Sequence, residues 1–262
     1  MAGVLDVETP APGVTLLRLN RPERLNALND ELVGSLETAC ARLAADASTR
    51  AVVLTGAGRG FCSGLDVRDF GPGIPDAAAP VAERLRFQER MASLPRGLRS
   101  LPQPVVAAIN GPCVGGGFAL CLGADLRLCS TSATFANAAI LLGLSGAEMG
   151  MSYHLPRIVG TSVAADWMLS GRSVSAEEAD RRGLVSQLVE PERLLERAIE
   201  LAAQIAGHSP FAVEMTKRAL QVNTDAADVD AALELENRTQ VLTFATDESA
   251  ARRGAWGRGG DD

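Results

Sequence analysis

Short runs of β-branched and other apolar residues recur along the first half of the chain, with longer stretches of different pattern between them. Runs of this length fit buried strands, and strands that alternate with helices are typical of an α/β fold. We therefore expect an α/β protein with strands over residues 14–19, 51–55, 105–109 and 126–129.

Helical periodicity marks the first long stretch between these runs and most of the chain's last third. Residues 26–45 place Leu28, Leu32 and Leu36 on one stripe, which predicts an amphipathic helix. After about residue 170 we expect mainly helices, three of them with proline near the start, over 175–182, 191–206, 210–221 and 226–244.

This change of character divides the chain into an α/β core over residues 1–205 and a C-terminal helical region over residues 206–262. Within the core, the stretch GPGIPDAAAP at residues 71–80 has no helix or strand period and predicts a mobile loop.

Composition narrows the classes of function. The chain has 262 residues, 47% of them hydrophobic, enough for a sizeable core. The net charge of -7 and a single lysine argue against nucleic-acid binding. The five cysteines form no Cys-x-x-Cys pair or Cys/His cluster, so we expect no metal. No apolar run reaches the length of a membrane span and no leader pattern is present, so we expect a cytoplasmic protein away from membranes.

Two glycine-containing turns follow two of the expected strands, at residues 56–64 and 111–117. A strand that enters such a turn and then a helix leaves backbone N–H groups unpaired, and these can bind a phosphate or a carbonyl oxygen. The first turn fails the dinucleotide fingerprint G-x-G-x-x-G, because its sixth position is Phe61. No Gly-Lys-Ser/Thr occurs, so a Walker A loop is also excluded.

The order and spacing of these motifs resemble the crotonase (enoyl-CoA hydratase/isomerase) superfamily. The second turn, Ile109-Asn110-Gly111 with Gly115-Gly116-Gly117 and Ala124-Asp125-Leu126, is similar to the family signature, and FCSGLDVRDF at residues 61–70 is similar to its first oxyanion loop. The resemblance covers nearly the whole chain. It implies a spiral of ββα units with two nearly perpendicular sheets, followed by helices that join subunits into trimers or hexamers (dimers of trimers).

The resemblance also implies a site. The backbone N–H groups of Ser63 and Gly116 would form an oxyanion hole for the thioester oxygen of an acyl-CoA substrate, which makes a separate cofactor unnecessary. Gly116 stands at the start of an expected helix, whose dipole would add to the hydrogen bond. Arg24, Leu65 and Asp66 are candidate contacts to CoA, and Asp66 is also expected to cap a helix that starts near it.

The sequence departs from the family pattern at both hydratase carboxylates. Ala119 and Ala139 stand where family hydratases place their two acidic residues. Such a pair holds and deprotonates the water that adds to the double bond, and each group contributes about a hundred- to ten-thousand-fold in rate. Glu148 is spaced like the acidic residue that moves protons in the family's dienoyl-CoA isomerases. One carboxylate is enough to shift a double bond.

Three functions therefore stay open. The first is an enzyme that shifts a double bond through a thioester enolate, with Glu148 as proton shuttle. The second is a hydratase whose acid and base groups have moved to other positions. The third is a non-catalytic acyl-CoA-binding homologue, which Ala119 and Ala139 favour. Acyl-chain length and physiological substrate do not follow from the sequence.

Overall fold

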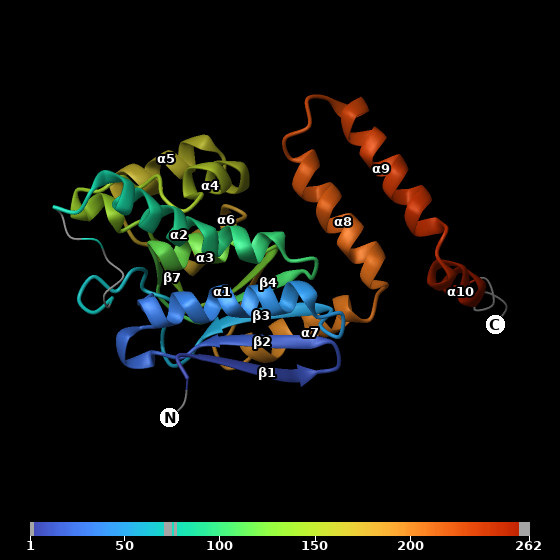
Figure 1. Ribbon diagram of the computed structural model, residues 1–262, viewed down its shortest axis with the longest axis horizontal. Coiled ribbons are helices and arrows are strands. Elements are labelled where there is room, and N and C mark those ends of the chain that lie inside the picture. Colours follow the sequence, from blue (N-terminus) through green and yellow to red (C-terminus); the bar gives the residue numbers. More distant parts are fainter. Residues whose placement is uncertain (1–2, 71–74, 76–77, 257–262) are drawn as a thin grey trace.

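A six-stranded sheet forms the centre of the α/β core (Figure 1). The computed structural model describes residues 3–70, 75 and 78–256. The first strand pairs antiparallel with the second, and every later neighbour in the sheet is parallel. In spatial order the strands are β1 (Leu5–Ala11), β2 (Val14–Leu19), β3 (Ala51–Gly56), β4 (Val105–Ile109), β6 (Leu126–Ser130) and β9 (Gln187–Val189).

The central strands are buried on both faces, which explains their continuous apolar runs. Successive side chains alternate between the faces. In β3, Val52 and Leu54 point into the larger core cluster, whereas Ala51 and Val53 join a second cluster on the opposite face. That second face is covered by α7 (Leu194–Ala206), which buries Leu194 and three alanines against the sheet.

The helices on the other face carry the segments that matter for function. They are α1 (Asp30–Ala45), α2 (Val81–Ser100) and α3 (Gly116–Gly123), followed by α4 (Met151–Val159) and α5 (Thr161–Ser170). A second, three-stranded sheet and three short helices complete the core: β5 (Cys113–Val114), β7 (Thr134–Ala136), β8 (Val174–Ser175), η1 (Pro22–Arg24), η2 (Ala139–Leu142) and α6 (Ala176–Arg181).

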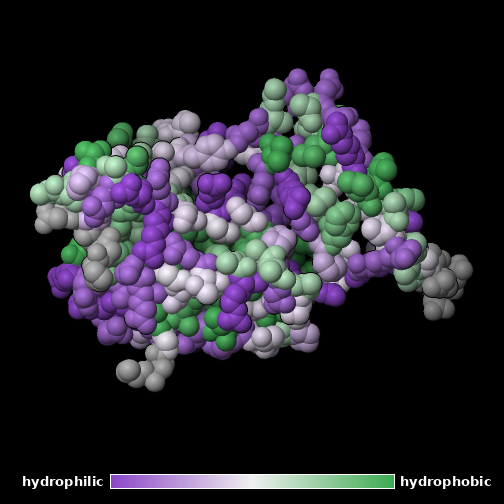
Figure 2. Space-filling model, viewed as in Figure 1, coloured by the Kyte–Doolittle hydropathy of each residue, from purple (hydrophilic) through white to green (hydrophobic). Residues whose placement is uncertain are grey.

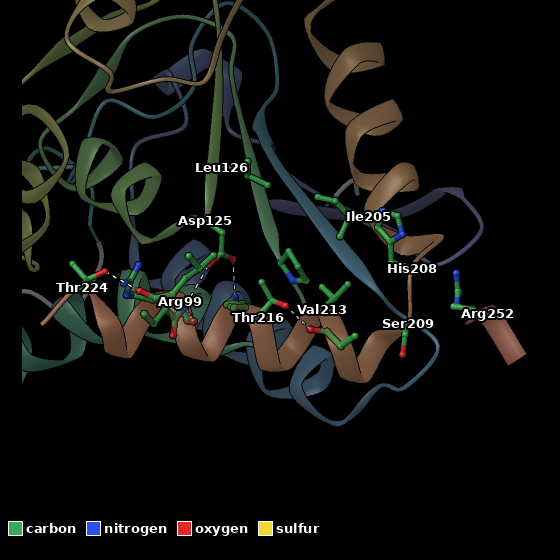
Figure 3. A pocket seen from close by; sticks show the side chains of 15 residues that line it. Arg99, Asp125, Leu126, Ile205, His208, Ser209, Val213, Thr216, Thr224 and Arg252 are labelled. Atoms are coloured by element: carbon green, nitrogen blue, oxygen red, sulfur yellow. Dashed lines mark hydrogen bonds and ion pairs between the residues drawn. The ribbon is translucent and has the colours of Figure 1, made fainter. Parts of the chain in front are cut away.

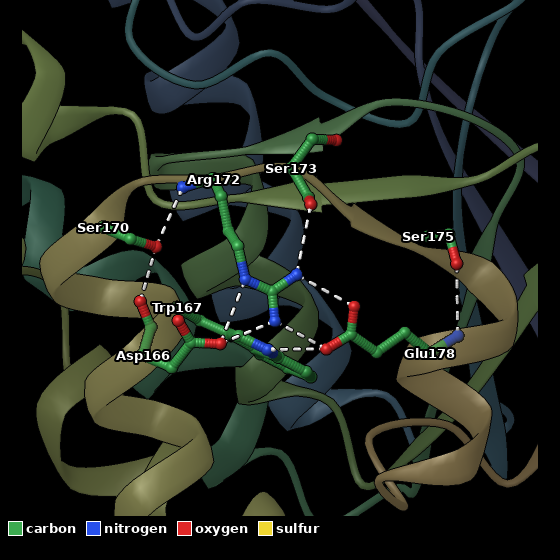
Figure 4. A network of polar contacts seen from close by, with 7 residues as sticks. All are labelled: Asp166, Trp167, Ser170, Arg172, Ser173, Ser175 and Glu178. Atoms are coloured by element: carbon green, nitrogen blue, oxygen red, sulfur yellow. Dashed lines mark hydrogen bonds and ion pairs between the residues drawn. The ribbon is translucent and has the colours of Figure 1, made fainter.

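An ion-pair network ties α5 to α6 (Figure 4). Arg172 contacts the carboxylates of Asp166 and Glu178 at 2.6 Å each, and the indole N–H of the buried Trp167 donates to Glu178. The adjoining Gly171 has φ +64°, and a Cβ there would lie 2.6 Å from Ile140 of η2. The network therefore holds the turn on which η2 rests.

The C-terminal helices extend away from this core (Figure 1). α8 (Pro210–Asn223) buries only Lys217, and neither α9 (Val229–Phe244) nor α10 (Asp247–Trp256) buries any side chain. Apolar patches are visible among polar ones on this part of the surface (Figure 2). Large exposed apolar side chains here include Leu220, Val229, Val241, Leu242, Phe244 and Trp256.

The structure confirms the α/β fold with two sheets and C-terminal helices, and it contains all four predicted strands. The helix predicted over 26–45 begins only at Asp30. Leu25 and Asn26 have positive φ angles, and the Asn29 side chain caps the helix by accepting from the Leu32 N–H. The helix expected near Asp66 is absent, since residues 66–70 are irregular.

Two expectations about organisation are not decided. Most of the predicted loop at 71–80 lies outside the described residues. The division into domains at residues 205 and 206 stays a prediction. Within the described part of the chain, no helix combines the length and the apolar character needed to cross a bilayer.

Candidate active site

Two loops meet where neighbouring strands of the large sheet end. β3 and β4 are parallel, so the segments that follow them leave from the same edge, where open α/β sheets usually bind ligands. The Val114 N–H donates to the Cys62 carbonyl at 2.9 Å and joins the loops. Gly64 has φ +90°, and a Cβ there would lie 2.9 Å from the Val114 carbonyl oxygen. Only glycine fits this close approach without strain.

The backbone N–H of Ser63 is not available to a ligand. It donates to the carbonyl of Leu25 at 3.0 Å, because the irregular segment around Leu25 runs beside the first loop. The prediction that Ser63 supplies an oxyanion donor is therefore wrong. The Ser63 hydroxyl also turns toward this segment and donates to the Arg24 carbonyl at 3.3 Å.

The N–H groups of Leu65 and Gly116, in contrast, donate to no described backbone or side-chain acceptor. Leu28 forms a parallel bridge with Leu65, in which the Leu28 N–H donates to Gly64 and the Asp66 N–H donates to Leu28. The N–H of Leu65 consequently faces away from Leu28. Gly116 is the first residue of α3, where the N–H lies outside the helical hydrogen-bond ladder and the helix dipole favours negative charge.

Both N–H groups belong to residues that line a cavity of about 110 Å³. A Cβ on Gly64 would lie 3.2 Å from the Gly116 nitrogen, so the two segments are in direct contact. Apart from Gly64, Gly115, Met149 and the two donor residues, the lining consists of Ser63, Val67, Phe87, Gln88, Met91, Ala138, Ala139, Leu142, Leu144 and Glu148.

Glu148 is the one ionisable side chain in this lining among the described residues. Its Oε1 lies 3.8 Å from where a Cβ on Gly115 would stand, which places the carboxylate beside the second loop. The Glu148 carboxylate itself forms no hydrogen bond or ion pair with any described side chain or backbone group. Burial raises the pKa of Glu148. An unpaired carboxylate with a raised pKa is well placed to accept and return a proton.

An unusual backbone positions Glu148. The next two residues, Met149 and Gly150, have φ angles of 48° and 83°, and a positive φ is uncommon for methionine. On the other side, the buried Asn137 donates to the Gly146 carbonyl at 2.7 Å. Asn137 thus fixes the loop that carries Glu148. Sequence reasoning missed it, because one asparagine between a strand and a turn gives no distinctive signal.

The hydratase positions hold no carboxylate in three dimensions either. Ala139 lines the cavity, and Ala119 is fully buried in the first turns of α3. The site thus combines two free N–H groups with one carboxylate.

The three candidate CoA contacts have different environments. Arg24 keeps an exposed guanidinium, 4.0 Å from the Asp69 carboxylate, and adjoins Ser63 at the cavity. Its role as a CoA contact stays a prediction. Leu65 contributes a free N–H, which can donate to a ligand where the N–H of Ser63 cannot.

The side chain of Asp66 is buried instead and pairs with the buried Arg21 at 3.0 Å. Burial acts to raise the pKa of Asp66, but the hydrogen bonds from Arg21 and from the N–H groups of Asp69 and Arg68 outweigh it and lower the pKa. The Asp66 carboxylate is therefore engaged inside the protein, and a contact between the Asp66 backbone and CoA stays a prediction.

A larger cavity of about 790 Å³ lies elsewhere, between α8 and the start of β6 (Figure 3). Its acidic residue, Asp125, is already paired with Lys217 at 2.7 Å. Asp125 directly precedes β6, so this cavity lies at the opposite end of the parallel strands from the two loops. None of its described lining residues offers a carboxylate that is free for proton transfer, so the smaller cavity is the better candidate for the chemistry.

Comparison with known proteins decides the family. The enoyl-CoA hydratase/isomerase family profile matches residues 9–256. The chain belongs to this family. It is 45% identical to the "Probable enoyl-CoA hydratase echA12" of Mycobacterium bovis over 253 residues, 94% of this chain and 88% of the relative.

Two solved structures extend the comparison. A probable enoyl-CoA hydratase/isomerase from Mycobacterium abscessus aligns with a TM-score of 0.87 and 40% identity, covering 97% of this chain and 96% of its own. A monofunctional enoyl-CoA isomerase from M. smegmatis aligns with a TM-score of 0.75 and 39% identity, covering 88% of this chain and 99% of its own. The protein is thus a member of an enzyme family that acts on acyl-CoA thioesters.

Proposed function

We propose that the protein isomerises a carbon–carbon double bond in an acyl-CoA through a thioester enolate. The single observation that carries this proposal is the presence of one unpaired carboxylate, Glu148, beside two free backbone N–H groups. Proton transfer between two carbons needs one group that first accepts and then donates. Hydration by the usual family route needs two carboxylates, and Ala119 and Ala139 stand in their places.

The steps follow from this arrangement. The thioester oxygen accepts hydrogen bonds from the N–H groups of Leu65 and Gly116. The Glu148 carboxylate removes a proton from the carbon next to the thioester, and the electron pair of that C–H bond moves into an enolate whose negative oxygen the two N–H groups stabilise. Protonated Glu148 then returns the proton to the far carbon of the double bond. Arg24 would contact a CoA phosphate at the entrance.

Relatives support more than one reading. The name of the M. smegmatis structure supports isomerisation, and the name of the M. bovis relative supports hydration with acid and base groups at other positions. The non-catalytic reading is favoured by the two alanines alone. Glu148, which lies in the cavity without a partner, makes isomerisation the reading that the geometry supports best.

The decisive experiment is a mass-spectrometric screen of turnover with trans-2-enoyl-, 3-enoyl- and dienoyl-CoA, run on the wild type and on Glu148→Gln. Glutamine keeps the size of the side chain but cannot accept the proton, so positional isomerisation should fall by about a hundred- to ten-thousand-fold. Glu196→Gln, at an exposed position on α7, is the matched control and should keep wild-type turnover.

Three outcomes would contradict the proposal in different ways. Formation of 3-hydroxyacyl-CoA at similar rates in wild type and Glu148→Gln would replace it with hydration by other groups. Binding of CoA thioesters without any turnover would leave a binding protein. Equal rates of isomerisation by the wild type and Glu148→Gln would show that a group other than Glu148 transfers the proton.

The pH dependence gives a second test. Glu148 must be deprotonated to act as the base, and burial raises its pKa above the ordinary 4.5. We therefore expect kcat/KM for isomerisation to fall as the pH drops through this raised pKa, with the acid limb at a higher pH than an exposed glutamate would give. Measurement of kcat/KM from pH 4.5 to 8 checks this. An acid limb at or below pH 4.5 would contradict a buried base.

A further inference from the structure

The candidate active site encloses very little space. Its cavity measures about 110 Å³. The cavity beside α8 is about seven times larger, at about 790 Å³. A long acyl chain whose thioester carbonyl lies at Leu65 and Gly116 would extend past the rim of this small cavity.

The rim is apolar and faces solvent. Val67, Leu142 and Leu144 all line the cavity, yet they are 68%, 64% and 62% exposed. They come from two separate segments, the loop after β3 and the region at and beyond the end of η2. An exposed group of large aliphatic side chains around a cavity mouth marks a surface that an apolar ligand covers.

The electrostatics of the lining exclude one class of acyl group. No arginine, lysine or histidine lines the cavity among the described residues, and the one charged group there is the Glu148 carboxylate. A second carboxylate at the end of an acyl chain would find no cation to pair with. It would also be repelled by Glu148 and would lose hydration against Val67, Leu142 and Leu144.

We propose that the rim of Val67, Leu142 and Leu144 binds the outer part of the acyl chain, so that the protein selects uncharged, apolar acyl groups and binds longer chains more tightly. This inference rests on the proposed function only in placing the thioester at Leu65 and Gly116. The occupant is the continuation of the molecule whose carbonyl lies in the cavity.

The test measures dissociation constants of saturated CoA thioesters by calorimetry, which requires no turnover. Full burial of a methylene contributes about fourfold in affinity (about 0.8 kcal/mol). Over a rim that buries the chain on one side, octanoyl-CoA should bind at least about tenfold more tightly than butanoyl-CoA. Glutaryl-CoA should bind more weakly than pentanoyl-CoA, which has the same number of carbons. Equal affinity along the series, or a preference for glutaryl-CoA, would overturn the proposal.

Variants locate the effect. The double variant Leu142→Ser/Leu144→Ser should reduce the ratio of octanoyl to butanoyl affinity to about threefold or less, because both side chains lose apolar surface. Leu141→Ser is the matched control: Leu141 lies in the same short helix and is 67% exposed, but it packs on Gly171 and does not line the cavity. Val67→Ser tests the rim from the other segment should the double variant fail to fold.

The outcomes separate this inference from the proposed function. If affinity increases with chain length but no isomerisation is detected, the acyl-binding role of the rim stands and the proposed isomerase activity is wrong. If the protein isomerises acyl-CoA but its affinity does not change with chain length, only the acyl-binding role of the rim is wrong. A gradient that Leu141→Ser flattens as much as the double variant would also overturn the assignment. If none of the CoA thioesters binds, both the proposed function and the acyl-binding role of the rim are wrong.

Discussion

The α/β core and the C-terminal helices are built on different principles. In the core, α1 buries five side chains on one stripe, Leu32, Val33, Leu36, Ala39 and Leu43. In the C-terminal region, α9 buries none and depends on local contacts such as the Asp228 cap and the Arg238–Glu234 pair. Core helices are thus stabilised by tertiary packing, whereas the terminal helices are stabilised by their own sequence and leave apolar side chains exposed. These exposed faces suit the predicted trimer or hexamer, which stays a prediction.

Lys217 is the main exception to this contrast, because it connects α8 to the core. Its side chain is 6% exposed, and its ammonium group binds the Asp125 carboxylate and, at 2.9 Å, the Gln103 carbonyl. Lys217→Met should destabilise the protein by about 3–5 kcal/mol, since Asp125 loses its cation. Arg218→Met, at the next and exposed position, should cost about 1 kcal/mol or less.

Urea unfolding of both variants measures this difference. If Lys217→Met costs no more than Arg218→Met, then water in the adjoining cavity hydrates Asp125 well enough to replace the lysine. The Lys217–Asp125 ion pair would then contribute less to holding α8 against the core than its burial indicates.

Leucine truncations test the contrast directly. Leu36 is buried in α1 and Leu242 is exposed in α9. Leu36→Ala should reduce the free energy of unfolding by about 2–5 kcal/mol through lost burial and the remaining cavity. Leu242→Ala should change it by about 0.5 kcal/mol or less in the dilute monomer. A large effect of Leu242→Ala that grows with protein concentration would show that another subunit covers α9.

The smallest expected effect concerns the helix caps. Asn29 caps α1 by accepting from the Leu32 N–H at 3.0 Å, and Asp228 caps α9 in the same way from the Ala231 N–H at 2.8 Å. Replacing either by alanine should cost about 1 kcal/mol. Hydrogen exchange should report the loss for Asn29→Ala across the core, but for Asp228→Ala only in the terminal helices. A uniform loss in both variants would mean that the two regions unfold together.

Most strands of the core could be predicted from local sequence because they are buried. β2 and β4 match their predicted limits, because continuous apolar runs between turn residues have few alternatives to a buried parallel strand. The edge strand β1 was missed. Its residues 5–11 are partly exposed and include Pro10, which weakens the apolar signal.

The site was predictable in its members but not in their roles. Gly116 and Glu148 line one cavity, as the resemblance implied, although no local pattern brings them together. The choice between Ser63 and Leu65 depends on which N–H already has an acceptor. That acceptor is the Leu25 carbonyl, almost forty residues earlier, so the assignment required the three-dimensional structure.

The two free N–H groups have a consequence for how the chemistry of such a chain can diverge. Main-chain amides at Leu65 and Gly116 survive nearly every amino-acid replacement, because substitution exchanges side chains and leaves the peptide unit in place. The proton-moving group is a side chain, and a single codon change can remove it. In the proposed mechanism, recognition of the thioester therefore depends on the fold, whereas the proton transfer that follows depends on one side chain that a single substitution can replace.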